Sequence, residues 1–136
     1  MAETLELEIV TPERLVVHES VEEVQIPGRS GYLGVLPGHA PLITELGVGE
    51  ITFRSGGATT RLAVAWGFAE VLSNKVTILA ETCERANEID VARAQQAKQR
   101  AEEKLRSQAP DTNYDEGQSA LKRAETRLDV AGKGGQ

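Results

Sequence analysis

Four arginines in the last third of the chain have the spacing of an anion-binding surface. Two sets of residues recur at helical intervals: Asp90, Arg93, Ala97 and Arg100 in the first set, and Arg123 and Arg127 in the second. Residues three or four positions apart share one face of a helix. If the two helices lie antiparallel, all four guanidinium groups can meet. Their forked donors match the oxygens of a phosphate group.

The same arginines are also compatible with an exposed helix pair held by salt bridges. Acidic residues occur on both segments: Glu102, Glu103, Glu125 and Asp129. Charged helix faces of this kind are commonly solvated. From spacing alone the salt-bridged interpretation is favoured over phosphate binding, and both remain open at this point.

The rest of the sequence offers no catalytic pattern. His18 lies in a strand-like stretch, where we expect an ordinary surface residue, and His39 lies in a turn. Cys83 is expected to be a partly buried small apolar residue. No group of His, Cys, Asp and Glu has the ligand spacing of a zinc or iron site, so no metal site is expected. The glycine-rich run 28–34 leads into Val35-Leu36-Pro37 and not into a helix, which excludes a phosphate-binding loop.

Composition narrows the functional class further. The 136 residues carry a net charge of −6, which argues against binding nucleic acid because phosphate backbones need a basic surface. A single cysteine excludes an intramolecular disulfide and is typical of a reducing compartment. The sequence shows neither a secretory signal nor an apolar run long enough to span a bilayer, so no direct membrane insertion is expected.

Two periodicities divide the chain. From residue 5 to residue 80 apolar residues alternate with polar ones, and Gly, Pro and Asn breakers recur at short intervals, as at Ser55-Gly56-Gly57. Many short alternating segments separated by turns predict an all-β sandwich. We expect this first domain to span residues 1–87.

Beyond residue 88 the apolar spacing becomes helical. Alanines and leucines recur every three or four residues in two runs, separated by turn residues around Pro110. We predict a C-terminal antiparallel α-helical hairpin over residues 88–136, with Asp90 at the start of its first helix. Alanine-rich stripes bury little area, so the hairpin should be only marginally stable and able to leave the sandwich.

Three segments resemble the epsilon-subunit family (delta in mitochondria) of F-type ATP synthases. The strongest is Gly31–Thr44, with the sequence GYLGVLPGHAPLIT, and Gly67–Val71 and Val76–Glu81 support it. The resemblance covers almost the whole chain and implies the same sandwich and hairpin that the periodicity predicts. Family members usually carry glycine where this chain has Trp66, and we expect that departure to alter local packing only.

The resemblance implies a non-catalytic subunit at the foot of the rotating central stalk. Its sandwich would hold the gamma subunit and rest on the c-ring, at the cytoplasmic face of the bacterial cell membrane. Its hairpin would fold down on the sandwich or extend to the beta subunits and inhibit ATP hydrolysis. The implied contact residues are Arg29, Ser30, Gly31 and Tyr32 towards the c-ring, and His39, Ala40 and Pro41 towards gamma.

Some bacterial members of this family bind ATP on the folded-down hairpin through the motif Ile/Leu-Asp-x-x-Arg-Ala, which this chain matches at residues 89–94. ATP is then a regulatory ligand that favours the folded-down state, and no cofactor is required. With the resemblance taken into account, phosphate binding by the four arginines is favoured over the salt-bridged helix pair. The implied ATP-binding residues are Glu84, Ile89, Asp90, Arg93, Ala94, Arg100, Arg123 and Arg127.

Two other functional classes remain as alternatives. A free-standing nucleotide sensor would bind ATP but not gamma, so co-purification with gamma separates it from a stalk subunit. An enzyme has no supporting constellation in the sequence, and ATP hydrolysis by the isolated chain would be needed to favour it.

Overall fold

The computed structural model describes residues 3–107 and 112–133, and within them lie seven strands, one 3-10 helix and two α-helices. Parts of the predicted inter-helix turn (108–111) and of the C-terminal end (134–136) lie outside the described residues. The elements are β1 (Leu5–Val10), β2 (Leu15–Val21), β3 (Glu23–Gly28), β4 (Gly31–Val35), β5 (Leu42–Ser55), β6 (Ala58–Val71), β7 (Lys75–Arg85), η1 (Ala86–Glu88), α1 (Val91–Arg106) and α2 (Tyr114–Lys133).

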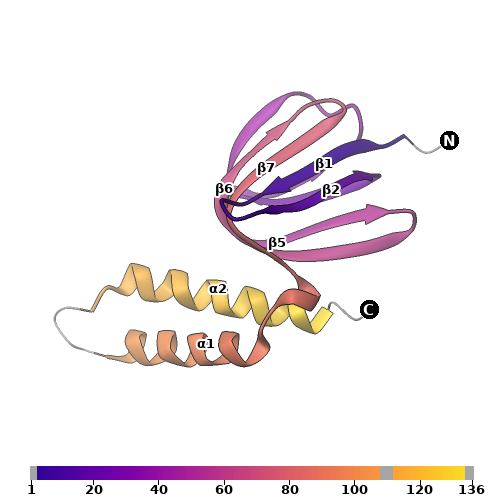
Figure 1. The fold of residues 1–136 in the computed structure, drawn as a ribbon. Helices are drawn as coiled ribbons and strands as arrows, with labels where there is room; N and C mark the ends of the chain where they lie inside the picture. The colour runs from indigo at the N-terminus through magenta and orange to yellow at the C-terminus, as the bar shows by residue number, and fades with distance from the viewer. Residues whose placement is uncertain (1–2, 108–111, 134–136) are drawn as a thin grey trace.

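The strands form one continuous sheet in the order β2-β1-β7-β6-β5-β3-β4, which curves around a common core (Figure 1). The pair β1–β7 is parallel and every other pair is antiparallel. The core consists of aliphatic side chains and one aromatic, including Leu7, Ile9, Ile51, Phe53 and Ile78. The all-β sandwich predicted from alternation is therefore confirmed. No helix in the described part of the chain is long and apolar enough to cross a membrane.

Strand β6 departs from simple alternation, because four consecutive residues, Leu62 to Ala65, are buried. Leu62 and Val64 point into the sandwich core, whereas Ala63 belongs to a second apolar cluster with Ile89 and Val130. Both faces of this part of the strand are therefore covered. The outer cover is α2, which packs against β5 and β6.

The pair Trp66-Gly67 reverses the orientation of β6. Leu62 and Val64 face the core before it, and Ala69 and Val71 face the core after it, so the inward positions change parity. Both residues have left-handed backbone angles, with φ of 62° at Trp66 and 140° at Gly67. Such angles are costly for any residue other than glycine. Trp66 therefore occupies a backbone angle that favours glycine, and the expectation that this departure alters local packing only stays a prediction.

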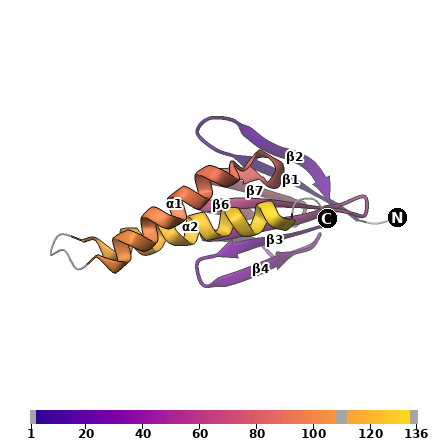
Figure 2. The ribbon, with the colours of Figure 1, turned by 90° about the horizontal axis from the view of Figure 1, so that it is seen from below.

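The two helices form the predicted antiparallel hairpin, lying side by side across one end of the sheet (Figures 1 and 2). The Asp90 carboxylate accepts a hydrogen bond from the Arg93 backbone N–H at 3.0 Å, which confirms the predicted cap of α1. Asn113 makes the equivalent bond to Glu116 N–H at the start of α2. At the far end Gly117 allows close contact, because a Cβ there would lie 2.9 Å from a methyl carbon of Leu105.

Only α2 packs extensively on the sandwich, and α1 is held mainly through α2. Val130 is fully buried against Ala63 and Ile89. Two polar contacts flank this apolar cluster, since Lys133 bonds Glu50 at 3.2 Å and Arg127 bonds Glu84 at 2.6 Å. The apolar part of this contact is one small cluster in the described part of the chain.

We predict that Gly67→Ala destabilises the sandwich by about 3 kcal/mol. A Cβ at this position would lie 2.1 Å from the Leu79 carbonyl oxygen, and the backbone angle is unfavourable for alanine. Chemical denaturation measures the effect. Gly132→Ala is the matched control: it lies in α2 with open space around its Cα and should stabilise the chain by about 0.5 kcal/mol. Equal stability of the Gly67→Ala variant and the wild type would contradict the close approach.

Candidate functional site

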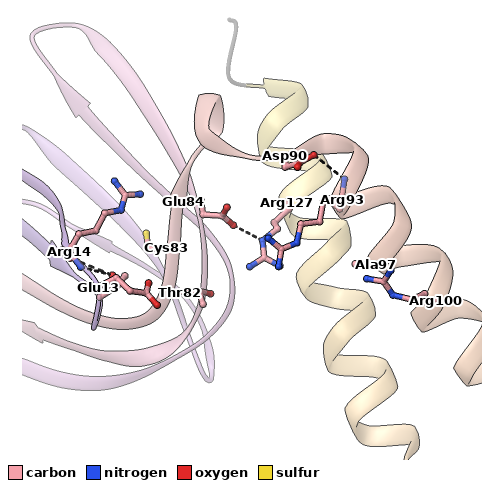
Figure 3. Close-up of a pocket in the computed structure, with 12 residues that line it drawn as sticks. Glu13, Arg14, Thr82, Cys83, Glu84, Asp90, Arg93, Ala97, Arg100 and Arg127 are labelled. Atoms are coloured by element: carbon pink, nitrogen blue, oxygen red, sulfur yellow. Dashed lines mark hydrogen bonds and ion pairs between the residues drawn. The ribbon is translucent and has the colours of Figure 1, made fainter.

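A pocket of about 490 Å³ lies between the hairpin and the sandwich (Figure 3). Its walls come from three places: the β1–β2 connection, the end of β7 and one face of α1, with one residue from α2. Its volume is within the range of small-molecule sites. The lining residues are Thr11, Glu13, Arg14, Thr82, Cys83, Glu84, Asp90, Arg93, Ala94, Ala97, Arg100 and Arg127.

Four arginines and three acidic residues line this pocket. Arg127 donates from Nε to Glu84 Oε1 at 2.6 Å, across the gap between α2 and β7 (Figure 3). Arg93 and Arg100 are exposed on α1, and no acidic oxygen among the described residues lies within 4.0 Å of either guanidinium group. Two cations on the wall of the pocket are therefore available to an anionic ligand.

The fourth arginine, Arg14, is anchored to the linker between sandwich and hairpin. Its guanidinium donates to Glu88 Oε1 at 2.9 Å, and the same carboxylate accepts from the Arg85 backbone N–H at 2.9 Å. The hydrogen bond from Arg14, reinforced by that from Arg85, holds the pKa of the Glu88 carboxyl below its usual range. Arg14 thus links the β1–β2 connection to η1, at the point where the chain leaves the sheet.

Of the eight residues that the family resemblance implies for ATP binding, the structure brings six together in this pocket: Glu84, Asp90, Arg93, Ala94, Arg100 and Arg127. Ile89 is instead buried under α2, where it packs with Ala63 and Val130. Arg123 lies one turn from Arg127 and lines a neighbouring small cavity that Arg127 and Thr82 also line.

The salt-bridged interpretation does not describe these arginines. Of the four acidic residues that it required, Asp129 pairs with Lys133 at 2.9 Å. In the described part of the chain, none of the four lies within ion-pair distance of Arg93, Arg100 or Arg123. The only hairpin arginine with an acidic partner there is Arg127, and its partner Glu84 belongs to β7.

Apart from Glu84, the residues on the sandwich side of the pocket were not predicted from the sequence. Thr11, Glu13, Arg14 and Thr82 contribute to it from strand ends and a connection. Helical spacing on α1 and α2 carries no information about these residues. The one available signal was Arg14 itself, an arginine in the turn after Thr11-Pro12.

The two surfaces implied for stalk contacts are both accessible. Arg29 and Ser30 form the tight turn between β3 and β4, and the Arg29 side chain is 77% exposed. Tyr32 is exposed, although its hydroxyl accepts the Glu50 backbone N–H at 3.1 Å. In the β4–β5 connection Ala40 and Pro41 are exposed, and His39 is half-buried with Nδ1 2.6 Å from the Ala40 carbonyl oxygen.

An apolar surface continues from this connection across the outer face of the sheet. Ile43, Trp66, Phe68 and Leu79, here termed the outer apolar patch, are 72%, 38%, 54% and 57% exposed. Phe68 lies directly opposite Leu79 in the β6–β7 ladder, and Glu45 flanks it on β5. Three of these residues also line a groove with Val10 and Pro12. Exposed apolar clusters of this kind mark contact surfaces.

Two family models match the chain. The model of the ATP synthase delta/epsilon chain β-sandwich domain matches residues 4–86. The model of the ATP synthase delta/epsilon chain long α-helix domain matches residues 87–132. Together they cover the sheet and both helices.

Individual proteins are similar over most of their length. The ATP synthase epsilon chain of Koribacter versatilis is 64% identical over 82% of this chain and 78% of its own length. ATP synthase epsilon chain 2 of Syntrophotalea carbinolica is 49% identical over 100% and 99%. A chain in the cryo-EM structure of the Euglena gracilis mitochondrial ATP synthase OSCP/F1/c-ring superposes with a TM-score of 0.81 at 25% identity, covering 94% of this chain and 81% of that one.

We predict that Cys83 is nearly unreactive in the folded protein. The side chain is buried, and this burial raises the pKa of the thiol from 9.0 to about 12, which lowers the thiolate fraction at pH 8 roughly a thousandfold. Ellman's reagent should therefore react far more slowly with native than with denatured protein. Thr82→Cys in a Cys83→Ala background is the matched control, because Thr82 is exposed and should be labelled quickly. Rapid labelling of native Cys83 would show that the base of the pocket is open.

Proposed function

Because the chain belongs to the delta/epsilon family of ATP synthase subunits, we propose that it is a regulatory stalk subunit whose helical hairpin is held against the sandwich by bound ATP. As a family member it is a subunit of the stalk and not one of the catalytic subunits. The observation that carries the proposal is the pocket between hairpin and sandwich, with two arginines that lack acidic partners among the described residues.

The triphosphate of ATP fits the arginine side of the pocket. Arg93 and Arg100 lie two turns apart on α1, and Arg127 faces them from α2 (Figure 3). Guanidinium groups bind phosphate oxygens through paired, charge-assisted hydrogen bonds. Arg127 already donates its Nε–H to Glu84, so an ATP phosphate would accept hydrogen bonds from the other N–H groups of that guanidinium. Arginine donors suffice for this recognition, so no metal cofactor is required.

The remaining wall suits the nucleoside. Ala94 and Ala97 leave space along α1 and offer an apolar surface on which a base can lie. Asp90 uses Oδ1 to cap α1, and its carboxylate has further acceptor capacity for an amine of the base. The four arginines outnumber the three acidic groups in the pocket, which favours an anion even though the whole chain carries −6.

A ligand in this pocket would join three parts that are otherwise weakly connected. The sandwich contributes Glu84 and Arg14, α1 contributes Arg93 and Arg100, and α2 contributes Arg127. Because α1 reaches the sandwich mainly through α2, ATP would supply a direct link. Undocking the hairpin destroys the pocket, so ATP binds only the folded-down state. Its binding free energy therefore stabilises that state, and the stabilisation grows with ATP concentration and affinity.

Without ATP the hairpin is free to leave the sandwich and extend. The contacts to be broken are the small cluster around Val130 and the ion pairs Arg127–Glu84 and Lys133–Glu50. Both ion pairs are partly buried, with side chains between 12% and 39% exposed. Undocking returns both partners of each pair to water and leaves no charge buried without a partner, so the net cost of separating them is small. We infer that the extended helices reach the catalytic beta subunits and inhibit ATP hydrolysis when ATP is scarce.

The sandwich would make the permanent contacts of the stalk. We assign the exposed turn Arg29 to Tyr32 to the c-ring, and His39, Ala40 and Pro41 to the gamma subunit. The outer apolar patch begins two residues beyond Pro41 and adds the apolar area that a stable contact with gamma needs. The proposed contacts imply a location at the cytoplasmic face of the bacterial membrane, as part of F1.

ATP titration by calorimetry tests the nucleotide site. The wild-type chain should bind one ATP, and Arg93→Ala should weaken binding at least about tenfold, because one charge-assisted interaction with phosphate is lost. Arg106→Ala is the matched control: it is an exposed arginine of the same helix outside the pocket and should leave affinity unchanged. Absence of heat from the wild type at millimolar ATP, or equal binding by Arg93→Ala, would refute the site.

Removal of the hairpin tests its role in the assembled complex. A chain ending at Glu88 keeps the entire sandwich core, so it should still co-purify with the other stalk subunits. The complex that contains it should hydrolyse ATP faster than the complex with the full chain, most clearly at low ATP. An unchanged rate would remove the inhibitory role, and loss of the truncated chain from the complex would show that the hairpin is needed for assembly.

A further inference from the structure

A group of metal-binding side chains lies away from the pocket, on β1 and β2. Within the described residues, Glu6, Glu8 and His18 offer three ligand atoms that all lie within 4.8 Å of one another. The ladder places Glu8 directly opposite His18, and Glu6 opposite Ser20. The intervening Leu7 and Val17 point into the core, so the three side chains share the outer face of the sheet.

We propose that Glu6, Glu8 and His18 bind a divalent transition-metal ion of the zinc class. One imidazole nitrogen and two carboxylates suit Zn²⁺ better than Mg²⁺ or Ca²⁺, which prefer oxygen ligands only. Three protein ligands leave the fourth tetrahedral position to water. The ion would connect β2, an edge strand, to its neighbour β1.

The present geometry is close to what such an ion requires. His18 Nε2 lies 2.6 Å from Glu6 Oε1, as a hydrogen bond in the absence of metal. Donor atoms around a tetrahedral Zn²⁺ are separated by about 3.4 Å. The metal would replace the shared proton, and the two atoms would move apart by about 1 Å. The side chains of His18 and Glu6 are 53% and 45% exposed, so nothing buried has to move.

One positive charge, the Lys75 ammonium group, already lies beside the cluster and would compete with a metal ion. Lys75 pairs with Glu6 in the β1–β7 ladder, and its Nζ lies 4.0 Å from Glu8 Oε2. A long, partly exposed ion pair is weak, so a divalent ion can displace the Lys75 ammonium group.

No other strong ligand in the chain competes with this cluster. The sequence has two histidines and one cysteine. His39 Nδ1 already contacts the Ala40 carbonyl oxygen, and Cys83 is a buried, neutral thiol. We therefore expect each chain to bind one ion of the zinc class, at His18.

Titration of Zn²⁺ into the tag-free full-length protein, followed by calorimetry and by NMR of the imidazole signals, tests the proposal. We expect one site, with the His18 resonances shifted and the His39 resonances unmoved. His18→Ala should weaken binding at least about tenfold, as should Glu6→Gln combined with Glu8→Gln, which preserves side-chain shape. His39→Ala is the matched control and should bind as the wild type does.

Lys75→Met gives an independent readout, because removing the competing ammonium group should tighten binding about threefold. Thermal unfolding of each metal-free variant shows whether it is folded. If the His18 variant fails to fold, the double glutamine variant decides the question. Absence of Zn²⁺ binding at millimolar concentration would overturn the site. Affinity that survives both the His18→Ala and the double glutamine changes would also overturn it.

Discussion

The contact between α2 and the outer face of β6 is the interaction on which the rest of the arrangement depends. At Ala63 and Ala65 the strand carries methyl groups where a sheet exposed to solvent would carry polar side chains. These small residues let the helix approach closely enough to bury Val130 fully. When α2 is in place, Arg127 reaches Glu84, and α1 is positioned to complete the pocket. The position of one helix thus determines whether the pocket exists.

The same contact is weak enough to be reversible. The sandwich has its own core, which includes no residue of the hairpin. In the described part of the chain, the hairpin adds one small apolar cluster and two ion pairs to sandwich residues. Breaking these contacts removes nothing from the sandwich core, which is one physical requirement for a subunit whose hairpin has two positions. In the proposed function, ATP shifts the balance between these positions without changing either domain.

Much of this architecture follows from the sequence. Alternation predicted the strands, helical spacing predicted the hairpin, and the role of Asp90 as a cap followed from its place before α1. The face of α1 that carries Arg93 and Arg100 was also predictable, because it depends on local geometry alone. The predicted domain limits at residues 87 and 88 remain a prediction. The features that were not predicted depend on contacts between segments that lie far apart in the sequence.

Three features show why those contacts could not be read from spacing. Arg14 joins the pocket from a connection 76 residues before Asp90, and no periodicity relates the two. Glu8 and His18 are neighbours only because of the register of two strands. At Trp66 a tryptophan occupies a left-handed backbone position, so the sequence gives no sign that the inward face of β6 changes there.

Amide hydrogen exchange of α1 tests the link between ATP and hairpin docking most directly. Exchange through undocking should slow by a factor of one plus the ratio of the ATP concentration to Kd, which is about a hundredfold when ATP is at one hundred times its dissociation constant. The Ala94 and Ala101 amides report on α1, and the Ile78 amide in the sandwich core serves as the reference. ATP should slow exchange in α1 and leave exchange at the reference amide unchanged. Equal exchange rates in α1 with and without saturating ATP would contradict it.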